Sequence, residues 1–314
     1  MLKKLSALPE FKKGILALLI SALIWGAATP ILKISLETVP PFSMAFIRFF
    51  IATLLILPFS NKFGLKNIKK NHLPKILKAS FFGVTLNIGF LFLGASLTSG
   101  LHISIIISLV PVFTAIIAHR LLKEKMPLNK ILGILLGFFG ALIIIGEPLL
   151  SSNAIPFKIE HIIGDIFIII SVLAWVGYII ENKELDKLNN YHPLEILPIS
   201  FAIGVASFFP LAVIEFLQNP AWIENVNLAA KFGIFYYGFF SSFLAYLLFT
   251  YGLSKTSATT ASLSDYLIPV ISILLSIPLL GERVTSFFAI GAVIIALGLI
   301  LTEIKRLPTS CLKR

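Results

Sequence analysis

Two charged residues lie inside long apolar stretches, and their types suit the binding of an ionic solute. Arg48 and Asp265 stand about seven and about eight residues into uncharged runs, roughly 10 Å deep if those runs are helical. A charge at the centre of a membrane helix costs about 2.5–3.5 kcal/mol or more. A guanidinium binds carboxylates well, whereas a buried carboxylate can bind an amine or carry a proton. We therefore expect both side chains to face a polar cavity.

Each of these charges also has a structural alternative. Arg48 would then cap helix carbonyls or pair with an acid such as Glu37. Asp265 would hydrogen-bond Ser262 or Ser264, or lie in water near the mouth of the bundle. The sequence leaves both alternatives open.

Two further polar residues, Asn87 and His102, lie within or near the ends of apolar runs. Asn87 would either bind a polar solute or join two helices. His102 would either take part in proton transfer or bond to a loop. Pro111 and Pro269 interrupt the backbone hydrogen bonding of two runs, as hinges or as static bends.

Aromatic residues form a third candidate group. Large aromatic side chains either line a cavity or lie in the interfacial belts of a membrane protein. We expect a cavity lining or gate to include Trp25, Trp175, Tyr178, Tyr246 and Tyr251. We assign Trp222, Tyr236 and Tyr237 to a belt.

The elements that position these residues are predicted to be membrane-spanning helices. Of 314 residues 57% are hydrophobic and 13% charged, against about 45–50% and about 25% in soluble domains. The apolar residues are continuous rather than alternating, which excludes a β-barrel pattern. Each run is long enough to cross a bilayer. The fold class is therefore all-α polytopic, with ten spans at about 14–35, 41–59, 75–96, 99–121, 128–146, 163–181, 193–216, 229–252, 257–280 and 284–303.

Positive charge predicts the orientation of these spans. With the N-terminus inside, 21 of the 26 Lys and Arg residues lie in cytoplasmic segments. Both termini are then cytoplasmic, and the chain lies in the inner membrane of a prokaryote. The net charge of +11 indicates anionic lipid headgroups as partners rather than nucleic acid. Sequence gives no choice between a monomer and a homodimer.

Motifs for the common catalytic and cofactor chemistries are missing. The sequence has no Walker A motif, no His-Glu-x-x-His, no Gly-x-Ser-x-Gly and no potassium-channel filter sequence. Its one cysteine, Cys311, excludes a cysteine-based metal site. We therefore expect no enzyme activity, no cofactor and no metal.

The chain also repeats itself, with domains at 14–146 and 163–303 and a linker at 147–162. A shift of about 150–158 residues aligns Trp25 with Trp175, Pro111 with Pro269 and Glu124 with Glu282. Five spans per half is an odd number, so the second half enters the membrane inverted, an arrangement typical of alternating-access transporters. Each glutamate is expected to cap the helix that follows it. The glycines of each half lie on one helix face and permit close packing: Gly133, Gly140, Gly291 and Gly298.

These features together resemble the EamA-type family of the drug/metabolite transporter superfamily. The resemblance covers about 14–303 and includes Trp25-Gly26, Arg48, Gly164-Asp165 and Gly281-Glu282-Arg283. Lys123 departs from it, because the second half has Gly281 there. The resemblance implies ten helices around a central cavity and export of amino acids or related small metabolites. We accordingly expect a secondary transporter for a small-molecule metabolite, with proton coupling as one drive. A channel or a receptor without carrier cycling is the alternative.

Overall fold

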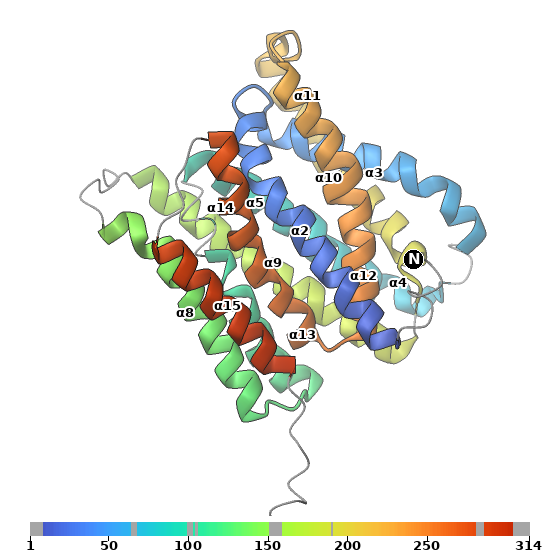
Figure 1. Cartoon of the computed structure of the whole chain (residues 1–314). Helices are drawn as coiled ribbons and strands as arrows, with labels where there is room; N and C mark the ends of the chain where they lie inside the picture. The colour runs from blue at the N-terminus through green and yellow to red at the C-terminus, as the bar shows by residue number, and fades with distance from the viewer. Residues whose placement is uncertain are drawn as a thin grey trace, which may run out of the picture.

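The computed structural model describes residues 9–63, 68–98, 103, 106–150, 159–189, 191–280 and 286–303. Every regular element in these residues is helical (Figure 1). The elements before residue 151 are α2 (Glu10–Leu36), α3 (Pro41–Phe63), η2 (Lys70–His72), α4 (Leu73–Ser80), η3 (Phe81–Leu86), α5 (Asn87–Leu97), α7 (Val110–Ile117), η4 (Ala118–Leu122) and α8 (Leu128–Leu150). Those after residue 158 are α9 (Ile159–Leu188), α10 (Pro193–Gln218), η5 (Pro220–Ile223), α11 (Leu228–Phe235), η6 (Tyr236–Leu244), α12 (Ala245–Lys255), α13 (Ala258–Leu263), η7 (Ser264–Tyr266), α14 (Leu267–Leu280) and α15 (Ser286–Glu303).

Within the described residues, six helices are long and apolar enough to cross a membrane: Glu10–Leu36, Pro41–Phe59, Lys70–Leu97, Ile162–Leu188, Pro193–Gln218 and Leu228–Lys255. Three shorter apolar helices fall on other predicted spans, at Val110–Leu122, Leu128–Gly140 and Ala289–Gly298. The outer surface is apolar as well, because large side chains such as Leu23, Leu54 and Phe139 are each more than half exposed. A surface of this kind suits lipid rather than water. The chain is thus a multi-pass membrane protein.

The main helix contacts join the part before residue 151 to the part after residue 158. α3 packs on α10, and α8 packs on α15. α2 packs on α12 and α14, while α9 packs on α5 and α7. In Figure 1, α2 crosses the centre between α14 and α12, and α8 and α15 lie side by side at one edge. The two segments are therefore interleaved and do not form separate bundles.

Two of the predicted spans are broken partway. In the span predicted at 257–280, the 3₁₀ segment η7 separates α13 from α14. In the span predicted at 99–121, a turn at Ser108 and Leu109 precedes α7. Pro111 and Pro269 follow these breaks, in the first turns of α7 and α14. An N–H in the first turn of a helix has no intrahelical partner, so proline fits there without disturbing the ladder. The expected interruption therefore lies before each proline, not at it.

The third and eighth predicted spans each contain a π-helical segment. η3 interrupts the helix made of α4 and α5, and η6 interrupts the helix made of α11 and α12. π-helical turns occur frequently at functional sites. A shift of 158 residues places η3 on the last six residues of η6.

Glycine allows a close contact between α8 and α15. A Cβ atom on Gly140 would lie 2.8 Å from the carbonyl oxygen of Gly291, and one on Gly298 would lie 2.7 Å from that of Gly133. The expected close packing is therefore present, with the glycines of α8 facing those of α15.

Glu124 corrects one expectation. Its carboxylate accepts hydrogen bonds from the backbone N–H of Ala258 (2.7 Å) and from the hydroxyl of Thr259 (2.8 Å). It therefore caps α13, in the other half of the chain, and not the helix that follows it. Glu282 lies outside the described residues.

Candidate functional site

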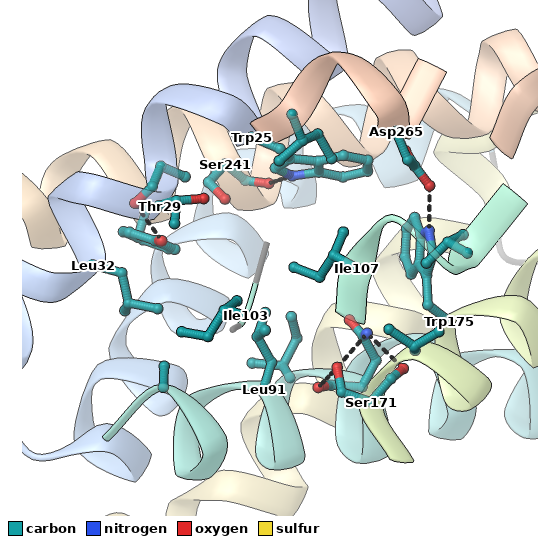
Figure 2. A pocket seen from close by; sticks show the side chains of 18 of the residues that line it. Trp25, Thr29, Leu32, Leu91, Ile103, Ile107, Ser171, Trp175, Ser241 and Asp265 are labelled. Atoms are coloured by element: carbon teal, nitrogen blue, oxygen red, sulfur yellow. Dashed lines mark hydrogen bonds between the residues drawn. The ribbon is translucent and has the colours of Figure 1, made fainter. Parts of the chain in front are cut away.

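A cavity of about 120 Å³ lies between α2 and α14 on one side and α5 and α9 on the other. One water needs only about 10–15 Å³ of such space, so a small solute fits. Figure 2 shows Trp25 and Asp265 across the cavity from Leu91 and Ser171. The lining is mainly apolar with a few polar groups, which is the usual composition of a small-molecule site. The predicted residues in the lining are Trp25, Arg48, Asn87, Trp175, Tyr246 and Asp265.

Arg48 lines this cavity and is 2% exposed. Its Nε donates to Ser242 Oγ at 2.6 Å, and one terminal nitrogen donates to Ser241 Oγ at 3.2 Å. The guanidinium carbon lies 4.9 Å from the ring centre of Tyr237. Glu37 is exposed and none of these partners is acidic, so within the described residues Arg48 is held by hydroxyls and rings that do not neutralise its charge. The guanidinium thus keeps capacity for an anion.

Asp265 lies in η7, at the break between α13 and α14, and is 2% exposed. The indole N–H of Trp175 donates to its Oδ2 at 3.2 Å (Figure 2). Its Oδ1 is buried with no hydrogen-bond partner. The two serines considered as partners bond backbone carbonyls instead. A buried acceptor without a partner is costly, so a ligand amine or a proton would be favoured there.

Five aromatic side chains pack together beside the cavity, and we call them the aromatic cluster: Trp25, Trp175, Tyr178, Tyr246 and Phe249. Trp175 stacks on Tyr178 with ring centres 5.0 Å apart and meets Trp25 edge-on at 5.3 Å. Tyr178 packs against Trp175, which lines the cavity, but Tyr178 itself does not line it. Each aromatic pair of this kind stabilises the fold by about 0.5–1.5 kcal/mol beyond the burial of its surface, so the cluster holds this side of the cavity in place.

The π-helical segments supply acceptors for this cluster. The hydroxyl of Tyr246 donates to the carbonyl of Gly83 in η3 at 2.9 Å. The indole of Trp25 donates to the carbonyl of Ser241 in η6 at 3.0 Å. Gly83 and Ser241 are 158 residues apart, the same shift that relates η3 to η6.

Asn87 contacts both the cavity and a second helix. Its Nδ2 donates to the carbonyl and the hydroxyl of Ser171, at 3.0 and 2.9 Å, and Ser171 Oγ donates back to the Asn87 carbonyl. Asn87 therefore joins α5 to α9, one of its two expected roles, while lining the cavity. Its binding role stays a prediction.

Two predicted residues are not among the described residues that line the cavity or form the aromatic cluster. Tyr251 lies near the start of α2, where its hydroxyl meets Glu10 and its ring meets Lys255, and it does not line the cavity. It stands on α12 five residues beyond Tyr246, close to the end of that helix. His102 lies outside the described residues.

Other lining residues were not predicted. Tyr237 was assigned to an interfacial belt, but it is 4% exposed, lines the cavity and donates to the Ala28 carbonyl at 2.7 Å. Ser241 and Lys33 also line the cavity. The adjacent Ser241 and Ser242 in an apolar run are a sequence signal that could have identified the Arg48 partners.

In the described part of the chain no three His, Cys, Asp or Glu side chains form a group that could hold a metal ion. The groups that the lining offers for recognising a solute are the Arg48 guanidinium, the Asp265 carboxyl group, the Lys33 ammonium and aromatic rings.

The comparisons with known proteins agree with this geometry. A family model described as "EamA-like transporter family" matches residues 12–146 and again residues 162–304. The chain belongs to the EamA-like transporter family. This is a family of transporters rather than of enzymes.

Curated transporters resemble this EamA-like chain over most of their length. Two "uncharacterized transporters" of Archaeoglobus fulgidus are 28% and 30% identical over 292 residues, covering 93% of this chain and 97% and 99% of theirs. The Bacillus subtilis "uncharacterized transporter YyaM" is 28% identical over 281 residues and 88% of each chain. One solved crystal structure matches with a TM-score of 0.75 at 17% identity, over 95% of this chain and 98% of its own, which shows a shared fold.

Proposed function

We propose that this EamA-like protein is a secondary transporter that exports a zwitterionic small metabolite, an amino acid or a close relative. The observation that carries this proposal is the pair of opposite charges in one cavity. Arg48 and Asp265 both line it, both are buried, and each bonds to neutral partners instead of to the other. A zwitterion brings a carboxylate for the guanidinium and an ammonium for the carboxylate.

The solute is held between two halves that exchange conformations. We take 14–146 and 163–303 as inverted five-helix repeats that give ten spans, with 147–162 as the linker and both termini cytoplasmic. The double match of the family model supports this organisation. So does the pairing of helices, because α2 on α12 and α9 on α5 are equivalent contacts under exchange of the halves. Two equivalent halves can open the site to one side and then to the other.

Asp265 also supplies a means of coupling transport to protons. A carboxyl group that binds either a proton or the solute amine cannot hold both, so proton entry on one side would release the solute. The partnerless Oδ1 supports this role. Pro111 and Pro269 would act as hinges beside the helix breaks.

Counterflow in proteoliposomes tests the proposed function. Vesicles loaded with an unlabelled neutral amino acid should accumulate the labelled one from outside, at carrier rates and without ionic current. Ohmic currents would favour a channel. Binding without counterflow for the whole set of amino acids would favour a receptor. Either result would overturn the proposal.

A further inference from the structure

Two lysines make the same kind of contact at opposite ends of the molecule. Lys33 Nζ, on α2, donates to the carbonyls of Ala95 at 2.9 Å and Thr98 at 2.8 Å, where α5 ends. Lys183 Nζ, on α9, donates to the carbonyl of Leu253 at 2.9 Å, in the last turn of α12. α2 and α12 run antiparallel, since Gly14 near the start of α2 faces Gly252 near the end of α12. The two contacts are therefore at opposite ends of the bundle.

The shift that relates the halves also relates these contacts. Lys33 and Lys183 are 150 residues apart, as are Trp25 and Trp175 on the same two helices. Ala95 and Leu253 are 158 residues apart, which is the shift that relates η3 to η6. A lysine on the last carbonyls of a helix is an ordinary C-terminal cap when it occurs once. Its recurrence at matched positions points to a role that both ends share.

Each lysine crosses the boundary between two helix groups. α2 packs on α12 and α14, and α5 packs on α9, with the cavity between these groups. Lys33 joins α2 to α5 at one end, and Lys183 joins α9 to α12 at the other. To separate the two helix groups at either end, the lysine hydrogen bonds at that end must therefore break.

The cavity reaches only one of the two ends. Leu32, Lys33 and Ala95 line it. Their matches at the Lys183 end, Asn182, Lys183 and Leu253, do not line it, and Asn182 and Leu253 are buried there. There Tyr178 and Thr250 share a hydroxyl hydrogen bond of 3.0 Å, and Lys183 also binds Asp186 at 3.0 Å.

The closed end nevertheless contains polar groups suited to a solute path. Asn182 is 3% exposed, and its Oδ1 has no hydrogen-bond partner. Tyr178 and Thr250 point their hydroxyls at each other across the boundary between the helix groups. An unsatisfied buried acceptor disfavours the closed form, and water or solute would satisfy it if this end opened.

We propose that Lys33 and Lys183 are matched latches closing the two ends of one solute path, both formed in this structure, and that Asn182, Tyr178 and Thr250 line the part of the path that side chains fill here. This rests on the proposed carrier function. Lys33 is the latch of the end that the cavity reaches, and Lys183, supported by Asp186, is the latch of the opposite end. Opening one end is coupled to closing the other, as alternating access requires.

Cysteine accessibility tests the proposal without any solute. In a Cys311→Ser background, Leu32→Cys and Asn182→Cys report on the two ends, and a membrane-impermeant thiol reagent is applied to either side of the vesicles. Lys183→Met should raise labelling at position 182 about tenfold, because loss of hydrogen bonds to a charged group shifts an equilibrium by about that factor. It should lower labelling at position 32. Lys33→Met should do the reverse.

Matched controls separate a latch from a general loss of structure. Lys183→Arg keeps a charged donor and should give the same labelling at positions 32 and 182 as the unmodified lysine. Leu173→Cys, on the exposed face of α9, should show the same labelling with and without either latch variant. If Lys183→Met does not fold, Asp186→Asn weakens the same latch. A folded Lys183→Met variant that leaves position 182 unlabelled, or that exposes it without lowering labelling at position 32, overturns the proposal. Absent counterflow with intact reciprocal labelling would reject the proposed substrate and leave the latches standing.

Discussion

At the scale of single residues, the cavity contains two opposite charges, on Arg48 and Asp265, that do not neutralise each other. Arg48 is held by Ser241 and Ser242, which fix its orientation without cancelling its charge. Asp265 has one oxygen bonded to Trp175 and one free. In the proposed function, such a pair recognises a solute by both of its charged groups, so each charge is expected to contribute separately to transport.

Removing the guanidinium should impair transport strongly. We expect Arg48→Ala to lower counterflow about tenfold or more, because hydrogen bonds to charged groups contribute about 1.5–3 kcal/mol each. Counterflow in Arg48→Lys should lie between that of the unmodified protein and that of Arg48→Ala, because lysine keeps the charge but cannot bind a carboxylate with two parallel hydrogen bonds. Lys75→Gln, which removes only a pair with Glu184 away from the cavity, is the control and should change flux less than about twofold. Full flux in Arg48→Ala would remove the residue from the site.

Replacing the carboxyl group should separate exchange from proton-driven transport. Asp265→Asn keeps the size of the side chain but cannot release a proton. We expect it to retain part of the solute exchange and to lose accumulation driven by a pH gradient. Trp175→Phe removes the indole donor but keeps an aromatic ring in the cluster, and it should keep the gradient response. Undiminished gradient-driven accumulation in Asp265→Asn would assign the coupling to another group.

At the scale of elements, apolar length predicted the long helices, whereas the local breaks had no clear sequence signal. The six long helices lie on predicted spans. The π-helical segments and η7 were not predicted, because they depend on partners distant in sequence, such as Tyr246 for Gly83 and Trp175 for Asp265. The prolines marked both broken spans, but the breaks precede them.

The same limit applies to the site. Arg48, Asp265, Trp25 and Trp175 could be predicted, since charge depth and the repeat both identify them. Tyr237 could not, because a belt and a cavity wall have the same local composition and only packing distinguishes them. At Lys123, by contrast, the repeat does carry a signal for local structure. The second half has Gly281 at the matched position, and Lys123 adopts a left-handed φ of 55°, which glycine tolerates best.

Contact between α8 and α15 depends on glycine at the crossing. Gly140→Val would place a branched side chain against the Gly291 carbonyl, where even a Cβ atom would lie 2.8 Å away. Overpacking of this kind costs about 1–3 kcal/mol, so we expect a clear fall in the melting temperature of the detergent-solubilised protein. Leu135→Val, on the exposed face of α8, should change it little. Equal melting temperatures for the two variants would contradict the close crossing.

At the scale of the whole molecule, two interleaved halves produce one cavity that no single half contains. Arg48 comes from the first half and its serines from the second, while Asp265 is reached by Trp175 from another helix of the second half. Because each charge depends on contacts between distant elements, the site exists only in the assembled bundle. Inverted halves would also place both chain ends on one side.

Reporter fusions check that arrangement. With ten spans, reporters fused before Met1 and after Arg314 should both give cytoplasmic signals, as the excess of lysine and arginine in the inner segments requires. A periplasmic signal at one end only would contradict the ten-span count, and periplasmic signals at both ends would contradict the predicted orientation. A reporter inserted in the 147–162 linker should give the opposite signal.

In the proposed function, one cavity recognises both charges of a zwitterion, and the protein carries the solute across the membrane. Competition in counterflow tests it most directly: an amino acid is compared with its analogues lacking the amino or the carboxyl group, in the unmodified protein, Arg48→Ala and Asp265→Asn. We expect the unmodified protein to prefer the amino acid over both analogues. Arg48→Ala should lose only the discrimination against the analogue without a carboxylate, and Asp265→Asn only that against the analogue without an amine. Equal competition by all three compounds in the unmodified protein would contradict the account.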